Sequence, residues 1–540
     1  MNDELWYKDA IFYQIYIRAF YDSNADGHGD IKGLTQKLDY LQELGVDCIW
    51  LMPIYPSPLR DDGYDIADYY DIAETFGSID DLKELIENAH QRNIRVIMDL
   101  VLNHTSDQHP WFQASRSDRS SPYRDYYVWS DTDQKYSDAR IIFLDTEPSN
   151  WTWDEKAGQY FWHRFYASQP DLNYDNLSVQ NEMLNVASFW LDMGIDGFRA
   201  DAVPYLFERE GTSGENLPET HAYLKRLRAF MDQKYPGRIL LCEANQSPED
   251  VRPYFGDGDE FHMGFHFPIM PRIYMALKKG RSEDMRQILD RTPEIPENCQ
   301  WCIFLRNHDE LTLEMVTPEE RDWMWKEYAP EPRMKLNLGI RRRLAPLLDN
   351  DPQKIELAYS LLFTLPGSPI LYYGDEIGMG DNIWLEDRNG VRTVMQWENA
   401  ANAGFSQASA ESLFSPVIDD EAFGAERVNV ASQRHDPDSL WNTIRKMIAI
   451  RRKHPAFGRG KFEWLDMDND HIAAFKRTYR DESVIAIHNL SSATHTISLK
   501  TKKSVTNLTD LLPGREFPSN SGRAEIALAP HQFLWLKSQM

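Results

Sequence analysis

Three acidic side chains stand where apolar runs of the sequence end. Asp201 closes "GFRAD", Glu243 closes "RILLCE" and Asp309 closes "FLRNHD". A carboxylate at the end of a buried strand loses hydration, so its presence there indicates that the site uses the charge. One carboxyl with a raised pKa and a second that stays ionised are what glycoside chemistry requires, as general acid and nucleophile.

Each of these carboxylates alone also has a structural interpretation, because an aspartate after a strand commonly caps the next helix. The combination is harder to explain by capping. Arg199 precedes Asp201 by two residues and can keep it ionised, and His308 is adjacent to Asp309. The sequence therefore predicts a catalytic site in which the three carboxylates converge.

Eight apolar runs, rich in β-branched and aromatic residues, would position these side chains. Continuous apolar character is typical of strands buried on both faces of a parallel sheet. The runs span residues 10–20, 48–54, 94–101, 197–203, 238–245, 261–267, 299–307 and 369–377. Amphipathic stretches such as 33–45 and 78–93 lie between them. Strands that alternate with helices predict an α/β fold of the TIM (β/α)8 barrel type, whose active site lies where the strands end.

The chain is long enough for one large domain with additions. We expect residues 1–104 and 176–457 to form the barrel. Residues 105–175 lack a long helical period and are expected to form an inserted lid subdomain, subdomain B, after the third strand. From residue 458 to 540 the pattern alternates between apolar and polar residues, which predicts a C-terminal antiparallel β-sandwich domain.

A second interruption, residues 311–348, follows the seventh predicted strand. Two of its stretches, 319–330 and 336–346, look helical. Because it follows a barrel strand, this excursion would also stand over the barrel mouth.

The bulk composition narrows the classes of partner. The formal net charge of −27 repels nucleic acid and anionic lipid, so we expect neutral small-molecule substrates, no nucleic acid and no membrane partner. No apolar run approaches the ~20 residues that span a bilayer, and the first residues lack the features of an export signal, which indicates a cytoplasmic protein. The acidic surface does not forbid a homodimer. The four cysteines are too few for a disulfide framework, and Cys299 and Cys302 are expected to be buried thiols rather than a redox or zinc pair.

The stretch "DSNADGHGD", residues 22–30, has the spacing of a loop that holds a hard cation. Oxygen ligands at alternate positions around Gly27 match an EF-hand loop. The candidate ligands are Asp22, Asn24, Asp26, the His28 carbonyl and Asp30. The closing glutamate of an EF-hand is absent, because that position is Gly33. A structural metal loop and a solvated acidic turn remain as the two interpretations.

Five ordered motifs resemble the signature regions of the α-amylase superfamily, glycoside hydrolase family 13. They are "DLVLNH" (99–104), "QPDLNY" (169–174), "GFRADAVPY" (197–205), "CEAN" (242–245) and "FLRNHD" (304–309). The resemblance implies that Asp201 is the nucleophile, Glu243 the general acid/base and Asp309 the carboxylate that stabilises the transition state and binds sugar hydroxyls. A catalytically inactive binding protein on this fold would usually lack one of the three.

The same resemblance implies which residues hold the glucose in the innermost subsite. They are Asp61, Tyr64, His104, Arg199, His308 and Arg392, the last from "RTVMQW", where relatives often have proline in place of Val394. Tyr64 as a core residue and His104 as a structural histidine at a strand end are the alternatives. No organic cofactor is implied.

Two calcium sites are also implied by resemblance. The loop 22–30 is similar to the calcium-binding loop after the first barrel strand in oligo-1,6-glucosidases. A second site would tie the insertion to the barrel. Its ligands would be Asn103, Asp171, Glu208 and the carbonyls of Tyr205 and Leu206.

Within the superfamily, several stretches look like the members that isomerise maltose to trehalose. They include "MPIYPSPLRDDGYDIADYY" and "FLRNHDELTLEMVT". This resemblance implies transfer of glucose from an α-1,4 to an α,α-1,1 linkage by a retaining double displacement, with some hydrolysis to glucose. The alternative is an α-glucosidase that hydrolyses maltose or short α-glucosides. The same carboxylates serve both reactions, so closure of the pocket by 105–175 and 311–348 would decide between them.

Overall fold

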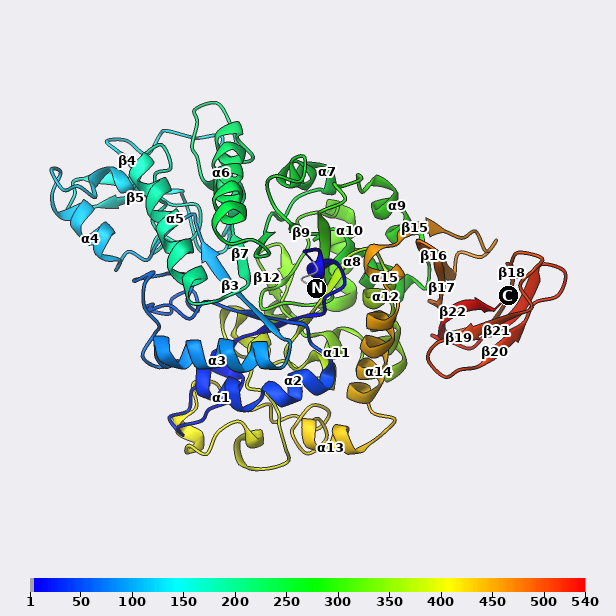
Figure 1. Cartoon of the computed structure of the whole chain (residues 1–540). Helices are drawn as coiled ribbons and strands as arrows, with labels where there is room; N and C mark the ends of the chain where they lie inside the picture. Colours follow the sequence, from blue (N-terminus) through cyan, green and yellow to red (C-terminus); the bar gives the residue numbers. More distant parts are fainter. Residues whose placement is uncertain (1–3, 540) are drawn as a thin grey trace.

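The computed structural model describes residues 4–539; residues 1–3 and 540, at the ends of the expected barrel and C-terminal segments, lie outside it. At its centre eight parallel strands close into a barrel (Figure 1), as the apolar runs predict. The strands are β1 (Phe12–Ile15), β2 (Cys48–Leu51), β3 (Arg95–Val101), β7 (Gly197–Asp201), β8 (Ile239–Cys242), β9 (Met263–Phe265), β10 (Gln300–Phe304) and β14 (Ser368–Tyr372). Every residue of these strands is buried except Arg95. Burial on both faces explains the continuous apolar runs.

Helices connect these strands and surround the barrel (Figure 1). They include α1 (Ile31–Gln36), α2 (Leu38–Leu44), α3 (Ile79–Gln91), α5 (Leu177–Asp192), α6 (Pro218–Lys234), α8 (Ile269–Lys279), α9 (Glu283–Arg291), α12 (Pro352–Thr364), α13 (Val430–His435) and α14 (Leu440–Lys453). In α3, Ser78 and Asp81 form a capping box that satisfies the first amide groups. None of the described helices is long and apolar enough to cross a membrane.

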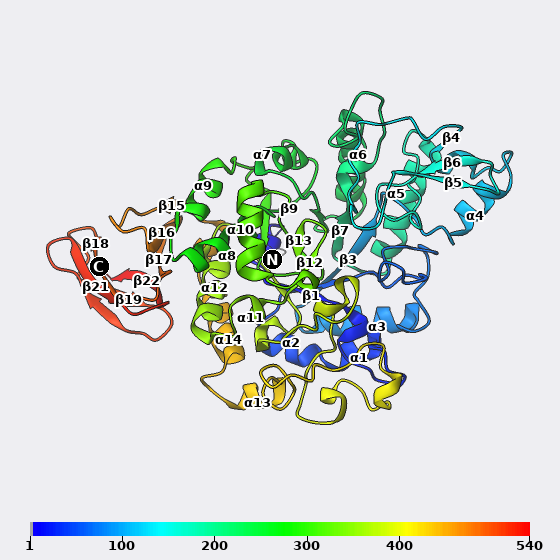
Figure 2. The same cartoon turned by 180° about the vertical axis from the view of Figure 1, so that it is seen from behind.

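The segment inserted between β3 and α5 forms its own small layer. It contains α4 (Pro110–Ser117) and an antiparallel sheet of β4 (Trp129–Ser130), β6 (Gln159–Trp162) and β5 (Trp151–Asp154), in that order. This layer and the C-terminal domain lie on opposite sides of the barrel (Figures 1 and 2).

The excursion after β10 is only partly helical. The helix α10 (Pro318–Tyr328) confirms the expectation for 319–330, whereas the expectation of a helix over 336–346 is wrong. Residues 335–340 instead form a hairpin of β12 (Lys335–Leu336) and β13 (Gly339–Ile340) that pairs with β11 (Leu311–Thr312), and one helical turn, α11 (Leu344–Leu347), follows. The local pattern permits these strands, and pairing with β11 selects them. Leu336, Leu338 and Ile340 alternate with period two, which suits strands, and Asn337 takes a left-handed φ of 47° that turns the chain.

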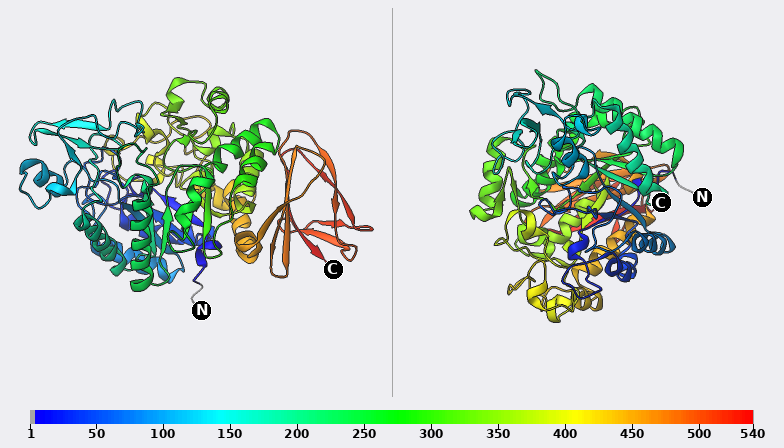
Figure 3. Two further views of the ribbon diagram at one scale, coloured as in Figure 1. Left: turned by 90° about the horizontal axis from the view of Figure 1, so that it is seen from above. Right: turned by 90° about the vertical axis from the view of Figure 1, so that its left-hand side faces the viewer.

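The C-terminal region is an antiparallel β domain (Figure 3), as expected. A six-stranded sheet has the order β15 (Lys461–Trp464), β16 (Ile472–Tyr479), β17 (Glu482–Asn489), β22 (Phe533–Gln539), β19 (Asn507–Asp510) and β20 (Glu516–Pro518). A two-stranded sheet pairs β18 (His495–Lys500) with β21 (Arg523–Leu528). Side chains from both sheets share a second hydrophobic core that includes Ile487, Ile497 and Ile526. All four cysteines of the chain are free and buried, as expected for Cys299 and Cys302.

Candidate active site

The three predicted carboxylates line one pocket at the carboxyl ends of the barrel strands. Asp201 is the last residue of β7, Glu243 follows β8, and Asp309 lies in the loop after β10. The pocket holds about 920 Å³ of empty space including its open mouth. The predicted Asp61, Tyr64, His104, Arg199 and His308 line the same pocket. The barrel topology brings them together, because the ends of parallel strands meet at one rim.

Arg199 connects the carboxyl groups of Asp201 and Glu243. Its Nη1 lies 2.5 Å from Oδ1 of Asp201, and its Nη2 contacts Oε1 of Glu243. The same Nη1 lies 2.6 Å from Oδ1 of Asp99, a fully buried residue of β3. Arg199 and Asp201 both face the barrel interior because side chains two apart on a strand share a face. One buried cation therefore contacts three carboxyl groups and balances the charge of one of them.

Burial sets the protonation states of Asp201 and Glu243. Burial raises the pKa of Glu243 to about 8, against the opposing effect of Arg199. Burial also raises the pKa of Asp201, to about 6, and here Arg199 and a hydrogen bond from Glu243 oppose the rise. Between these values Glu243 carries a proton and Asp201 is ionised. A protonated carboxyl beside an ionised one is the state that an acid and a nucleophile need.

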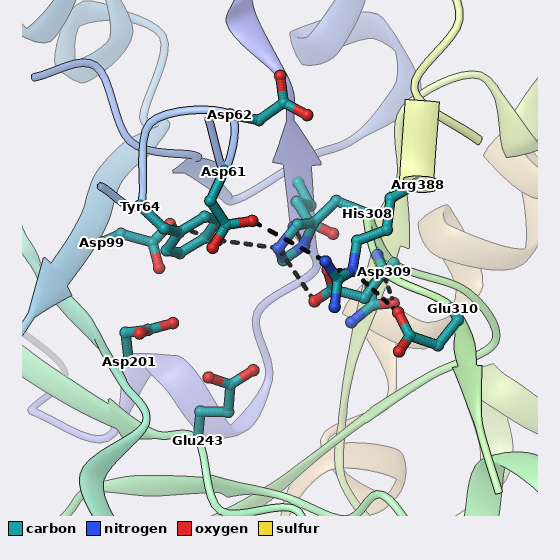
Figure 4. Close-up of polar contacts among 12 residues, drawn as sticks. Asp61, Asp62, Tyr64, Asp99, Asp201, Glu243, His308, Asp309, Glu310 and Arg388 are labelled. Atoms are coloured by element: carbon teal, nitrogen blue, oxygen red, sulfur yellow. Dashed lines mark hydrogen bonds and ion pairs between the residues drawn. The ribbon is translucent and has the colours of Figure 1, made fainter. Parts of the chain in front are cut away.

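Asp309 is held on both of its carboxylate oxygens. Nε of Arg388 lies 3.0 Å from Oδ1, and Nε2 of His308 lies 3.1 Å from Oδ2 (Figure 4). Nη2 of Arg392 lies 3.1 Å from Oδ1. The charge-assisted contacts with the two guanidinium groups fix the position of the carboxylate. Asp309 is therefore an oriented carboxylate at the rim of the pocket.

A stacked pair of rings forms one wall. The rings of Tyr64 and His308 lie 5.4 Å apart with an interplanar angle of 13°, and the Tyr64 hydroxyl lies 2.9 Å from His308 Nε2 (Figure 4). The Gln14 side-chain amide lies 2.6 Å from Nδ1 and donates to it. Because Nδ1 accepts, Nε2 carries the proton and can donate to Asp309. Burial lowers the pKa of His308 well below its usual value, so this imidazole is neutral.

The pocket has a roof made from two separate segments. Ile142, Phe143 and Phe165 of the insertion line it, and so do Thr312 and Glu314 of the excursion and Glu310 just before it. Arg140 joins the two segments, because its Nη1 lies 2.9 Å from Glu314 Oε2. Its Nε lies 2.8 Å from Oε1 of Glu215, in the loop between β7 and α6. The backbone amide of Asn337 donates to Asp145 over 2.9 Å. The insertion is therefore fastened to the excursion across the mouth.

One predicted sugar ligand lies outside this lining. Arg392 is buried and contacts Asp309 and Asp62, but it is not among the residues that line the pocket. Arg388, four residues earlier, does line it and lies 3.9 Å from Asp61. Asp61 also accepts a 2.8 Å hydrogen bond from Gln169, and burial raises its pKa to about 7.

Arg388 and Asp99 are site residues that the sequence analysis missed. Arg388 lies in the short 3-10 segment Asp387–Val391, which has no periodic pattern that could have marked it. Asp99 gave a signal, because it is a charge inside the apolar run 94–101.

The residues of the second calcium site that the resemblance implies supply oxygen ligands, which a hard cation prefers. His104 and Asp171 form an isolated β-bridge, which places Asn103 beside Asp171. Asn103 Oδ1, Asp171 Oδ2 and Glu208 Oε1 are buried and have no hydrogen-bond partner. Burial raises the pKa of Asp171 to about 8, and burial together with Asp171 raises the pKa of Glu208. Three unsatisfied buried oxygens of these types fit Ca2+, and Tyr205 and Leu206 precede Glu208 by three and two residues.

The loop 22–30 uses most of its oxygens internally. Asp22 Oδ1 accepts from the amides of Asn24 and Ala25, and Asp22 Oδ2 accepts from the amide of Gly27. Asp26 accepts from the amide of His28, and Asp30 caps α1. No group of three or more acidic, histidine or cysteine side chains in residues 4–539 has the arrangement of a metal site. The side chains of this loop therefore form local turns with its own backbone. Their oxygens are of the type that binds a hard cation, but fewer of them are free than in the set Asn103, Asp171 and Glu208.

Comparison with known proteins places this architecture in a family. The model "Alpha amylase, catalytic domain" matches residues 14–329 and 340–460, and "Maltogenic Amylase, C-terminal domain" matches residues 462–535. A trehalose synthase of Pimelobacter sp. (strain R48) is 55% identical over 98% of this chain and 96% of its own length. The trehalose synthase/amylase of Mycobacterium tuberculosis (strain ATCC 25618 / H37Rv) is 56% identical over 99% and 90%.

Solved structures are also similar to this chain over nearly its whole length. The trehalulose synthase MutB of Pseudomonas mesoacidophila MX-45 has a TM-score of 0.80 and 27% identity, with 99% of each chain covered. An α-amylase from H. orenii has a TM-score of 0.80 and 29% identity over 98% of this chain and 100% of its own. With the barrel, the ordered motifs and the carboxylate pocket, these matches lead to one conclusion: the chain belongs to the α-amylase family, glycoside hydrolase family 13.

Proposed function

We propose that this protein isomerises maltose to trehalose by a retaining double displacement, with some hydrolysis to glucose. The observation that carries the proposal is the pairing of Asp201 and Glu243 through Arg199 at the base of a roofed pocket. Trehalose synthases that match nearly the full chain support the choice of substrate.

The first displacement uses the ionised carboxylate of Asp201 and the protonated carboxyl of Glu243. The ionised Asp201 attacks the anomeric carbon of the non-reducing glucose, and the C1–O bond to the leaving glucose breaks. Glu243 gives its proton to the departing oxygen. A covalent glycosyl ester on Asp201 and a free glucose are the products of this step.

The second displacement returns the proton. Glu243, now ionised, removes the proton from the anomeric hydroxyl of the released glucose after that sugar has turned in the pocket. The oxygen attacks the glycosyl ester, the bond to Asp201 breaks, and the α,α-1,1 linkage forms with retained configuration. Water in place of this hydroxyl gives glucose, so exclusion of water decides the product.

The remaining pocket residues orient the transferred glucose. Asp309 and His104 offer hydrogen bonds to hydroxyls, Tyr64 offers an aromatic face, and His308 orients Asp309 through the proton on Nε2. Asp61 and Arg388 lie on the same wall and suit the hydroxyls farthest from the scissile bond. Arg392 supports Asp309 from behind rather than through the pocket surface.

An α-glucosidase with the same carboxylates is the alternative. The fastening of Arg140 to Glu314 favours the isomerase, because a pocket closed by two segments can retain glucose while it turns. Incubation with unlabelled maltose and added labelled glucose tests the choice. Intramolecular isomerisation gives trehalose that carries little label, whereas glucose as the sole product from maltose supports the hydrolase. Asp201→Ala should abolish both activities, and an unchanged turnover would refute the catalytic assignment.

The proposal also covers bound calcium, the ligands and partners of the protein, its oligomeric state and its cellular location. Structural Ca2+ at Asn103, Asp171 and Glu208 would tie the insertion to the barrel, and the loop 22–30 is a second candidate. The proposed ligands are maltose, trehalose and glucose, with no organic cofactor and no nucleic acid or membrane partner. Free buried thiols suit a cytoplasmic setting, and a homodimer is compatible with the acidic surface.

A further inference from the structure

Asp62 has no role in the chemistry described above, yet it occupies an unusual position. It follows the pocket residue Asp61 in the loop after β2, with a left-handed φ of 45°. Asp62 is not among the residues that line the pocket, and its carboxylate points away from Asp201 and Glu243 (Figure 4). An aspartate with left-handed backbone conformation is held there by its surroundings.

Three side chains converge on the Asp62 carboxylate. Nη1 of Arg392 contacts Oδ2, the Tyr16 hydroxyl donates to Oδ1 over 2.8 Å, and Nη1 of Arg18 lies 3.7 Å from Oδ1. Tyr16 and Arg18 follow β1, and Arg392 follows β14. The strands β14, β1 and β2 are neighbours in the barrel, so Asp62 ties together the loops that follow three adjacent strands.

The contact with Arg392 leads directly to the pocket. Arg392 also lies 3.1 Å from Asp309 Oδ1 through Nη2, and its Nε donates to the His308 carbonyl over 2.8 Å. A planar guanidinium held at three points has a single orientation. Asp62 supplies one of these points and one of the two carboxylates that share the charge of Arg392.

We propose that Asp62 is a positioning residue for the reaction: it fixes Arg392, and through Arg392 it sets where Asp309 meets the transferred glucose. Without the Asp62 charge, Asp309 would be the only carboxylate left to Arg392, and the arginine would shift toward it. Asp309 would then be drawn away from the sugar, and small displacements of such groups cost rate. The inference rests on the proposed function, because it requires Asp309 to act on the sugar in the transition state.

The variant Asp62→Asn tests this proposal in the full-length enzyme. We expect kcat for trehalose formation from maltose to fall about tenfold, equivalent to about 1.4 kcal/mol, while KM changes by less than about threefold. Asp68→Asn is the matched control, since it removes a negative charge from the same loop at an exposed position. The control should keep the wild-type kcat. A normal kcat in Asp62→Asn would overturn the proposal.

Two further variants separate positioning from general stability. In an Arg392→Lys background, Asp62→Asn should cause little additional loss of kcat, because both residues act on one path; full additivity would count against the proposal. Asp62→Glu restores the charge and should recover part of the lost rate. A lowered melting temperature with an unchanged kcat of the folded fraction would indicate a structural role alone.

The proposed function can fail independently of this inference. If the wild-type enzyme releases only glucose from maltose, the isomerase proposal is wrong. The same comparison of variants on glucose release then tests Asp62, since Asp309 serves the first displacement in both reactions. An Asp62→Asn variant that hydrolyses maltose at the wild-type kcat would refute the positioning role in that case as well.

Discussion

Asp201 and Glu243 bind the two terminal nitrogens of a single guanidinium, that of Arg199. A shared guanidinium keeps the two carboxyl groups in one compartment. This arrangement suits a covalent glycosyl intermediate. An inverting enzyme separates its carboxyl groups by roughly 6.5–9.5 Å to leave room for a water between them.

The first prediction is a bell-shaped pH dependence of kcat/KM for maltose. Activity requires ionised Asp201, whose pKa is about 6, and protonated Glu243, whose pKa is about 8. The rate should therefore rise as the pH rises through about 6 and fall as it rises through about 8, because kcat/KM reports the free enzyme. Initial rates at constant ionic strength across this range check the two limbs.

A substrate that needs no acid isolates the alkaline limb. α-Glucosyl fluoride has a leaving group that departs without protonation, so formation of the glycosyl ester should no longer depend on protonated Glu243. Fluoride release in the first turnover should stay high above pH 8 in the wild type. An alkaline limb that persists in this measurement would assign that limb to a group other than Glu243.

The second prediction concerns the roof of the pocket. Arg140→Gln removes the ion pair with Glu314 that fastens the insertion to the excursion, and also the ion pair with Glu215 in the loop between β7 and α6. The looser roof should admit water to the glycosyl ester, so the ratio of glucose to trehalose should rise several-fold while maltose consumption falls less. Chromatography of the products measures the ratio directly.

Lys156→Gln is the control for this variant. It removes a positive charge from an exposed position of the same insertion, away from the pocket lining. Its product ratio should match the wild type. Equal ratios in Arg140→Gln and the wild type would show that this contact does not control the fate of the intermediate.

The barrel and its carboxylates were predictable because they leave local signals. Strands buried on both faces produce continuous apolar runs, and Asp201, Glu243 and Asp309 interrupt the polarity pattern at the ends of those runs. Burial makes such interruptions costly, which is why they are informative. The resemblance of the ordered motifs to the α-amylase family then implied the catalytic role of each carboxylate.

The missed features depend on contacts distant in sequence. Arg388 enters the pocket because the 3-10 segment after β14 packs against the loops that carry Asp309 and Asp61. The stretch 336–346 has apolar residues that fit more than one period, and pairing of β13 with β11 selects the hairpin. Neither choice is encoded within a short window of residues.

The third prediction tests calcium at Asn103, Asp171 and Glu208. Without metal, a carboxyl whose folded pKa is raised stabilises the fold at low pH and loses this contribution as the pH rises through that pKa, which is about 8 for Asp171. Calcium requires the ionised carboxylates and replaces their protons. The increase in melting temperature that Ca2+ gives over chelator should therefore be larger near pH 8.5 than near pH 6. At about 100 times Kd the stabilisation is about 2.7 kcal/mol.

Variants locate the calcium effect within the fold. Glu208→Gln removes the negative charge of a carboxylate that has an unsatisfied buried oxygen. It should abolish most of the calcium-dependent increase in melting temperature. Glu210→Gln, an exposed change two residues away, should retain it. If Glu208→Gln keeps the full calcium effect and Asp26→Asn loses it, the ion is bound by the loop 22–30, because Asp26 belongs to that loop alone. Thermal melting needs no substrate, so the outcome does not depend on which reaction the enzyme catalyses.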